Sequence, residues 1–140
     1  MLAFLGFALF YLAALNGTLS LGLENCTGSI ADDLLAGPII SLILYFGGLI
    51  CLVIARPPRT AYIAASPILF LVAWQFKFTV ELAYGYVIQG RSACAVLHDL
   101  PYEFDGREAT FIGLWLAMCL IPLIGLLLAF RRAKPRSLPH

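Results

Sequence analysis

The sequence predicts an all-α integral membrane protein, a four-helix up-down bundle that crosses the bilayer four times. Composition is the first of three observations behind this prediction: 61% of the 140 residues are hydrophobic, only 12% are charged, and the mean hydropathy is +0.92. A soluble domain is about 45–50% apolar and about 25% charged, so this chain has too few charges to cover a surface that faces water. The net charge of +1 supports no basic patch, and we expect no nucleic-acid partner.

Four long apolar stretches are the second observation. They predict helices at about 1–23, 34–55, 60–89 and 109–130 of a single domain, residues 1–140. A hydrocarbon core of about 30 Å needs about 20 residues of helix, and each stretch reaches that length. Lipid offers the backbone no hydrogen-bond partner, and the stretches lack the alternation of a transmembrane strand, so helix is the expected structure.

Each stretch is bounded by its own signals. We expect the first to be retained rather than removed as a signal peptide, because no basic residue precedes it and no small-residue cleavage site follows it. The proline pair in Arg56-Pro57-Pro58-Arg59 predicts a tight connection, and therefore an antiparallel hairpin of the second and third helices. Pro67 and Pro122 lie inside the third and fourth stretches, where each is expected to kink its helix.

The third observation is that basic and acidic residues are unequally divided between the two sides of the membrane that the four predicted helices would cross. One side carries six basic residues and no acidic one: Arg56, Arg59, Arg131, Arg132, Lys134 and Arg136. The other carries two basic and seven acidic residues: Arg91, Arg107, Glu24, Asp32, Asp33, Asp99, Glu103, Asp105 and Glu108. The positive-inside rule then predicts cytoplasmic termini, with loops 24–33 and 91–108 outside, in a bacterial inner membrane.

The four cysteines fall into two classes. Cys51 and Cys119 lie within apolar stretches, where we expect them to pack as small apolar side chains. Cys26 and Cys94 lie in the two loops expected on the oxidising side, so a disulfide between them is predicted.

A polar site is expected within the outer part of the membrane. At 1.5 Å per residue, Lys77 lies about one turn inside the outer boundary and Glu81 lies at it; the i,i+4 spacing lets them pair. The same count brings Asn16, Ser41 and Trp115 to a similar depth.

The predicted site therefore consists of Lys77, Glu81, Asn16 and Trp115, whose indole could meet the ammonium face-on. Gln75, about 200° around the helix from Lys77, is expected to point elsewhere. Three interpretations stay open: a snorkelling lysine neutralised by its carboxylate, a polar contact to a partner subunit, or the wall of a substrate or ion path.

The outer loop, residues 91–108, alternates apolar and charged side chains. Its apolar members suit docking on a partner or on the membrane surface: Leu97, Leu100, Tyr102 and Phe104. His98, Asp99, Glu103 and Asp105 could ligate a metal, but a second histidine and a recognised spacing are missing, so no metal and no cofactor is predicted.

The sequence shows no Ser/His/Asp set, no glycine-rich phosphate loop and no carboxylate pair inside a helix bundle, so we expect no enzyme activity. The first hypothesis is a non-catalytic accessory subunit of a larger multi-subunit membrane complex, surrounded by lipid and by partner subunits or further copies of itself. The alternatives are a small oligomeric transporter or channel that uses Lys77 and Glu81, and a membrane redox protein that uses Cys26 and Cys94.

Overall fold

Helices make up almost all of the chain that the structure, a computed structural model, describes: residues 1–23, 30–91, 96 and 108–133. The elements are α1 (Leu2–Leu23), α2 (Ile30–Ala55), the 3-10 helix η1 (Arg59–Ala65), α3 (Ser66–Val87) and α5 (Glu108–Arg132). Four segments are long and apolar enough to cross a membrane: Leu2–Ser20, Ala36–Ala55, Arg59–Val87 and Ile112–Arg132. The all-helical prediction is confirmed.

Proline positions explain how the third apolar stretch begins. Arg56 has a φ of 44°, which ends α2 just ahead of Pro57 and Pro58, and the chain then forms η1 before α3. Pro67 stands in the first turn of α3, where its fixed φ suits the start of a helix. Pro67 thus lies at the junction of η1 and α3, and not inside α3 as predicted. Pro122 does lie inside α5, and Pro38 lies inside α2.

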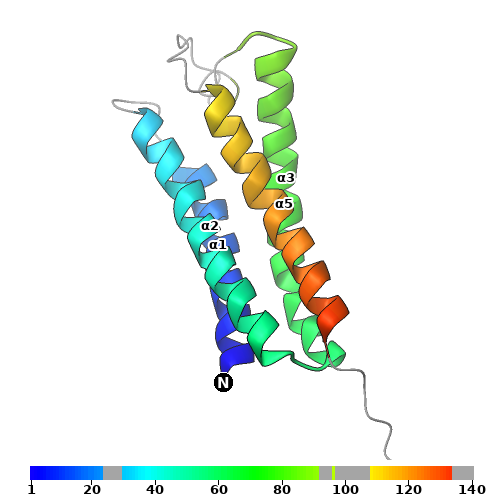
Figure 1. Cartoon of the computed structure of the whole chain (residues 1–140). Coiled ribbons are helices and arrows are strands. Elements are labelled where there is room, and N and C mark those ends of the chain that lie inside the picture. The colour runs from blue at the N-terminus through cyan, green and yellow to red at the C-terminus, as the bar shows by residue number, and fades with distance from the viewer. Residues whose placement is uncertain (24–29, 92–95, 97–107, 134–140) are drawn as a thin grey trace, which may run out of the picture.

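The helices run alternately up and down and surround one core (Figure 1). α1 packs against α2 and α3, and α5 packs against the same two helices on the other side. α2 and α3 are antiparallel but lie diagonally across the bundle, so the predicted hairpin of neighbouring helices is wrong. The reason is η1, which packs on α1 and α3 and carries the chain across the end of the bundle.

Glycine allows α1 and α2 to approach closely. A Cβ at Gly48 would lie 2.9 Å from the carbonyl oxygen of Gly6 and 2.5 Å from the ring of Phe10. Small residues at such crossings let helix backbones pack directly, which is how helices associate where lipid surrounds them. Phe10 then packs on Tyr45, with 5.3 Å between ring centroids, and both are fully buried.

The outside of the bundle is largely apolar. Large exposed side chains occur on every long helix, among them Phe4, Ile43, Phe70 and Ile124. α3 extends further than the other helices at the end opposite Met1 (Figure 1). At about 2.0 Å per residue in η1 and about 1.5 Å in α3, Arg59 and Val87 lie about 45 Å apart, which exceeds the hydrocarbon thickness of about 30 Å.

Candidate functional site

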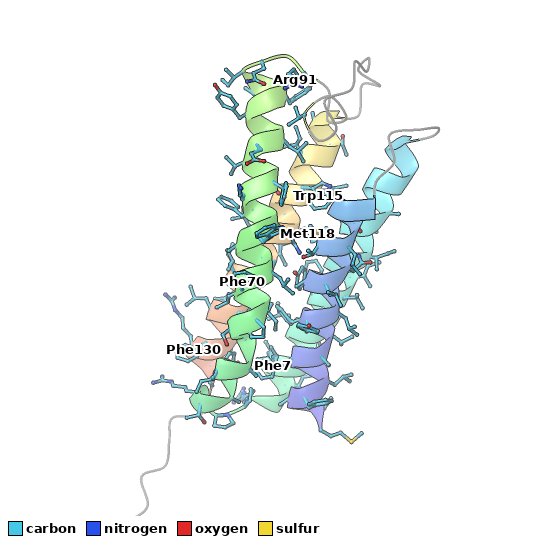
Figure 2. The ribbon with its side chains drawn as sticks, turned by 180° about the vertical axis from the view of Figure 1, so that it is seen from behind. Phe7, Phe70, Arg91, Trp115, Met118 and Phe130 are labelled. Atoms are coloured by element: carbon cyan, nitrogen blue, oxygen red, sulfur yellow. The ribbon has the colours of Figure 1, made fainter. Side chains whose placement is uncertain are left out.

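The structure does not bring the four residues of the predicted polar site together. Asn16 and Trp115 lie inside the bundle, and Trp115 is fully buried beside Met118 in the interior (Figure 2). Lys77 and Glu81 lie on the outward face of α3, where their side chains are 67% and 54% exposed. The predicted site thus divides into an inner polar layer and an outer charged pair.

The first part of the inner polar layer joins α1 to α2. The Asn16 amide donates to the Gly37 carbonyl oxygen and to Ser41 Oγ, both at 3.0 Å. Ser41, fully buried, donates in turn to the Ala13 carbonyl oxygen at 2.9 Å. Three hydrogen bonds therefore cross between the two helices at one level. The predicted similarity in depth of Asn16 and Ser41 is confirmed, and their role here is to hold helices together.

The second part joins α1 to α3 through Gln75, which is fully buried. Its Nε2 donates to the Ala14 carbonyl oxygen at 2.6 Å and to Thr18 Oγ1 at 3.0 Å. Gly17 makes room for this amide, because a Cβ there would lie 3.0 Å from Gln75 Nε2 and 3.0 Å from Met118 Sδ.

Gln75 is the residue that the sequence interpretation missed. It does point away from Lys77, as predicted, but the side to which it points is the interior. A signal was present: Ile68, Val72, Gln75, Thr79 and Leu82 follow a 4-3-4-3 spacing, and all five are buried. That spacing is typical of a helix face that packs on other helices.

Thr79 continues the inner polar layer toward α5. Its hydroxyl donates to the Gln75 carbonyl oxygen at 2.9 Å, one turn back, and Oγ1 lies 3.7 Å from Cys119 Sγ. Within the described residues, Gln75 Oε1 and Tyr45 Oη are buried without a hydrogen-bond partner. The layer thus consists of amides, hydroxyls and a thiol, which can form hydrogen bonds between helices.

The outer charged pair is an ion pair between two residues of α3. Lys77 Nζ and Glu81 Oε1 are 4.0 Å apart on successive turns of α3. The predicted pairing of these two residues is confirmed. The predicted contact between the Lys77 ammonium and the indole of Trp115 is wrong. Lys77 is exposed on the outward face of α3, whereas Trp115 is fully buried inside the bundle.

An aromatic cluster closes the opposite end of the bundle. The ring of Tyr62 in η1 packs edge-on against Phe7 of α1 and Phe130 of α5, with centroids 5.4 Å apart in each case. Arg59 places its guanidinium 5.6 Å from the centroid of Phe130. Phe7 and Phe130 both lie at this end of the bundle (Figure 2). These contacts fix η1 and show why the connection crosses the bundle.

Several predicted residues lie outside the described part of the chain. These are Cys26 and Cys94 of the predicted disulfide, the docking-loop residues Leu97, Leu100, Tyr102 and Phe104, and the candidate ligands His98, Asp99, Glu103 and Asp105. Among the residues that the structure does describe, no group of three or more His, Cys, Asp or Glu side chains could hold a metal ion.

The fold and the two polar features define a class: a bundle of four helices, each long and apolar enough to cross a membrane, with uncharged polar groups inside and a charged pair outside. Comparison with known proteins gives no more specific assignment, because no family model, curated protein or solved structure matches the chain.

Proposed function

We propose that the protein is a non-catalytic accessory subunit of a larger membrane complex. Its four apolar helices would cross a bacterial inner membrane with both ends in the cytoplasm. Arg56 and Arg59 follow α2, and Arg131 and Arg132 end α5, so these four arginines flank the end of the bundle at which α1 begins. The positive-inside rule assigns such an end to the cytoplasm.

The observation that carries the proposal is the position of the outer charged pair. A charge on a membrane-spanning helix is costly in hydrocarbon, about 2.5–3.5 kcal/mol at the centre and less toward the boundary near which Lys77 and Glu81 are expected, and it usually faces protein or water. Lys77 and Glu81 face neither the core nor another of the described helices, since more than half of each side chain is exposed. A partner subunit packed on this face of α3 would cover both.

The inner polar layer also supports a non-catalytic function, because its polar side chains are used in hydrogen bonds between helices. Asn16, Ser41 and Gln75 direct their donors at backbone carbonyl groups and hydroxyls of neighbouring helices. Interhelical hydrogen bonds of this kind stabilise a bundle. These three residues are thus accounted for by interhelical hydrogen bonds.

Purification from native membranes in a mild detergent tests the proposal. We expect the protein to elute with another membrane protein in fixed ratio, and we expect Lys77→Leu/Glu81→Leu to reduce that recovery at least about tenfold, because it removes both charges from the face that the partner would cover. Ile43→Ala on the exposed side of α2 is the matched control and should leave recovery unchanged. Elution without any other protein would overturn the proposal.

One alternative is favoured by the same observation. In an oligomeric transporter or channel, outward-facing Lys77 and Glu81 would lie on the wall of a path between copies. Glu81→Gln should then change flux across reconstituted vesicles while the helix content stays constant. Equal flux for wild type and variant would exclude this alternative.

A further inference from the structure

Four exposed arginines lie at the end of the bundle at which α1 begins, and we call them the arginine cluster. Arg56 follows α2, Arg59 begins η1, and Arg131 and Arg132 end α5. The acidic residues that the structure describes, at positions 32, 33, 81 and 108, all lie toward the other end of the bundle. Within the described chain, therefore, no carboxylate neutralises the arginine cluster.

Aromatic contacts place Arg59 beside the end of α5. Its guanidinium lies 5.6 Å from the ring centroid of Phe130, and Phe130 in turn packs edge-on against Tyr62, with 5.4 Å between centroids. The attraction of a cation to a ring face uses none of the five guanidinium N–H donors in a hydrogen bond. Phe130 directly precedes Arg131, so the ring brings the cation of η1 next to the cations of α5.

Helix electrostatics accounts for only part of the arginine cluster. Arg131 and Arg132 lie in the last turn of α5, where the helix dipole favours a cation. Arg59 is the first residue of η1, and a cation is disfavoured at that end of a helix. The charges of the described fold therefore do not explain why Arg59 lies beside two further arginines.

The arginine cluster stands at the level of lipid headgroups. Two of the segments that are long and apolar enough to cross a membrane have an end here, since Arg59–Val87 begins at one of these arginines and Ile112–Arg132 ends at another. Leu120, Ile124 and Leu127 precede Arg131 with a 4-3-4 spacing, so they share its face of α5, and they are 45–56% exposed. An acyl chain that lies along this apolar face would bring its phosphate to Arg131.

We propose that the arginine cluster binds the phosphate of an anionic phospholipid, with Arg59, Phe130 and Arg131 as the central residues. Phosphate oxygens accept the paired N–H donors of a guanidinium group. The depth of the cluster favours a lipid phosphate over a soluble one, because lipid phosphates already lie at this level. An anionic headgroup also lacks the cation with which a zwitterionic headgroup would repel the arginines. This inference goes beyond the accessory role and does not depend on it.

Native mass spectrometry of the full-length chain in a mild detergent measures the binding. Phosphatidylglycerol is added at rising concentration and compared with phosphatidylcholine that carries the same acyl chains. We expect phosphatidylglycerol to bind at least about tenfold more tightly, and we expect Arg59→Gln and Arg131→Gln each to weaken its binding about fivefold. Arg91→Gln removes the same charge at the other end of the bundle and should leave binding unchanged. Equal affinity for the two lipids would overturn the inference.

Variants that keep every charge separate a built site from general attraction to cations. Phe130→Leu removes the ring beside Arg59 and should weaken binding of phosphatidylglycerol about threefold, whereas Phe46→Leu, which removes an exposed ring from α2, should not. Arg59→Lys should weaken binding as well, because an ammonium lacks the paired donors of a guanidinium, and it leaves the contact of Phe130 with Tyr62 in place. Wild-type affinity in both Phe130→Leu and Arg59→Lys would overturn the inference.

Glycerol 3-phosphate distinguishes a lipid from a soluble phosphate, since it presents a phosphate without acyl chains. Added in large excess, it should not displace phosphatidylglycerol, and displacement would overturn the assignment to lipid. The result is also distinct from that of the proposed function. A chain that binds phosphatidylglycerol but elutes without another protein would support this inference and exclude the accessory role. A chain that elutes with a partner but shows no preference for phosphatidylglycerol would do the opposite.

Discussion

The two faces of α3 carry polar groups in the same heptad spacing, but with different chemistry. The buried face presents Gln75 and Thr79, which are neutral and bond to carbonyl groups on α1 and on α3 itself. The exposed face presents Lys77 and Glu81, which pair with each other, with 4.0 Å between Nζ and Oε1. Neutral polar side chains thus hold the bundle together, and charged ones are turned outward.

Desolvation explains this division. The N–H group of an amide taken into an apolar interior needs only a hydrogen-bond acceptor, and helix carbonyl groups such as that of Ala14 supply it. A buried ammonium or carboxylate costs several kcal/mol even after its partner is counted. A charge on a membrane helix therefore does not by itself identify the interior of a single chain. It identifies a face that needs a neighbour.

The strongest test of this comparison places a charge on the buried face. Gln75→Lys puts an ammonium where the side chain is fully buried and where no carboxylate is hydrogen-bonded nearby. We expect at least about 3 kcal/mol lower stability. Equilibrium unfolding in mixed micelles, followed by circular dichroism, measures the change. Gln89→Lys on an exposed turn is the control and should unfold like wild type.

Packing around the buried amide gives the next largest effect. Gly17→Leu adds a side chain where a Cβ alone would lie 3.0 Å from Gln75 Nε2 and from Met118 Sδ. Overpacking of this kind costs about 1–3 kcal/mol. Gly113→Leu is the matched control on α5, because no atom lies within 4 Å of its added Cβ. Equal unfolding midpoints for the two variants would show that α1 and α3 are less closely packed than described.

The exposed face gives the smallest effect in the isolated chain. Lys77→Leu/Glu81→Leu removes a pair whose side chains are 67% and 54% exposed. Its loss should change the free energy of unfolding of the detergent-solubilised monomer by less than about 0.5 kcal/mol. A loss comparable to that of Gln75→Lys would mean that the pair stabilises the bundle itself.

The helices could be predicted from the sequence because apolar length and proline are local signals. Prolines at Pro57 and Pro58 predicted the break after α2, and the structure shows it. The order of helices around the bundle could not be predicted. It depends on how η1 packs, and this is decided by contacts of Tyr62 with Phe7 and Phe130, which lie 55 and 68 residues away along the chain.

The candidate site could be predicted only in part, for a related reason. Helix geometry correctly paired Lys77 with Glu81 and set Gln75 on the opposite face. Which face looks inward depends on the position of α1 and α5, and the two faces of α3 carry their polar residues with equal spacing. Gly17, which admits the Gln75 amide, lies on another helix, so its contact with α3 could not be read from the sequence of α3.

The central claim is that the exposed face of α3 that carries Trp74, Lys77 and Glu81 is covered by protein in the membrane. Photo-crosslinking in native membranes measures this directly, with benzoylphenylalanine in place of Trp74 and, as the matched position, of Phe46 on α2; the two side chains are 49% and 51% exposed. We expect a protein–protein adduct from position 74 and only lipid adducts from position 46. Lipid adducts alone from both positions would contradict the account.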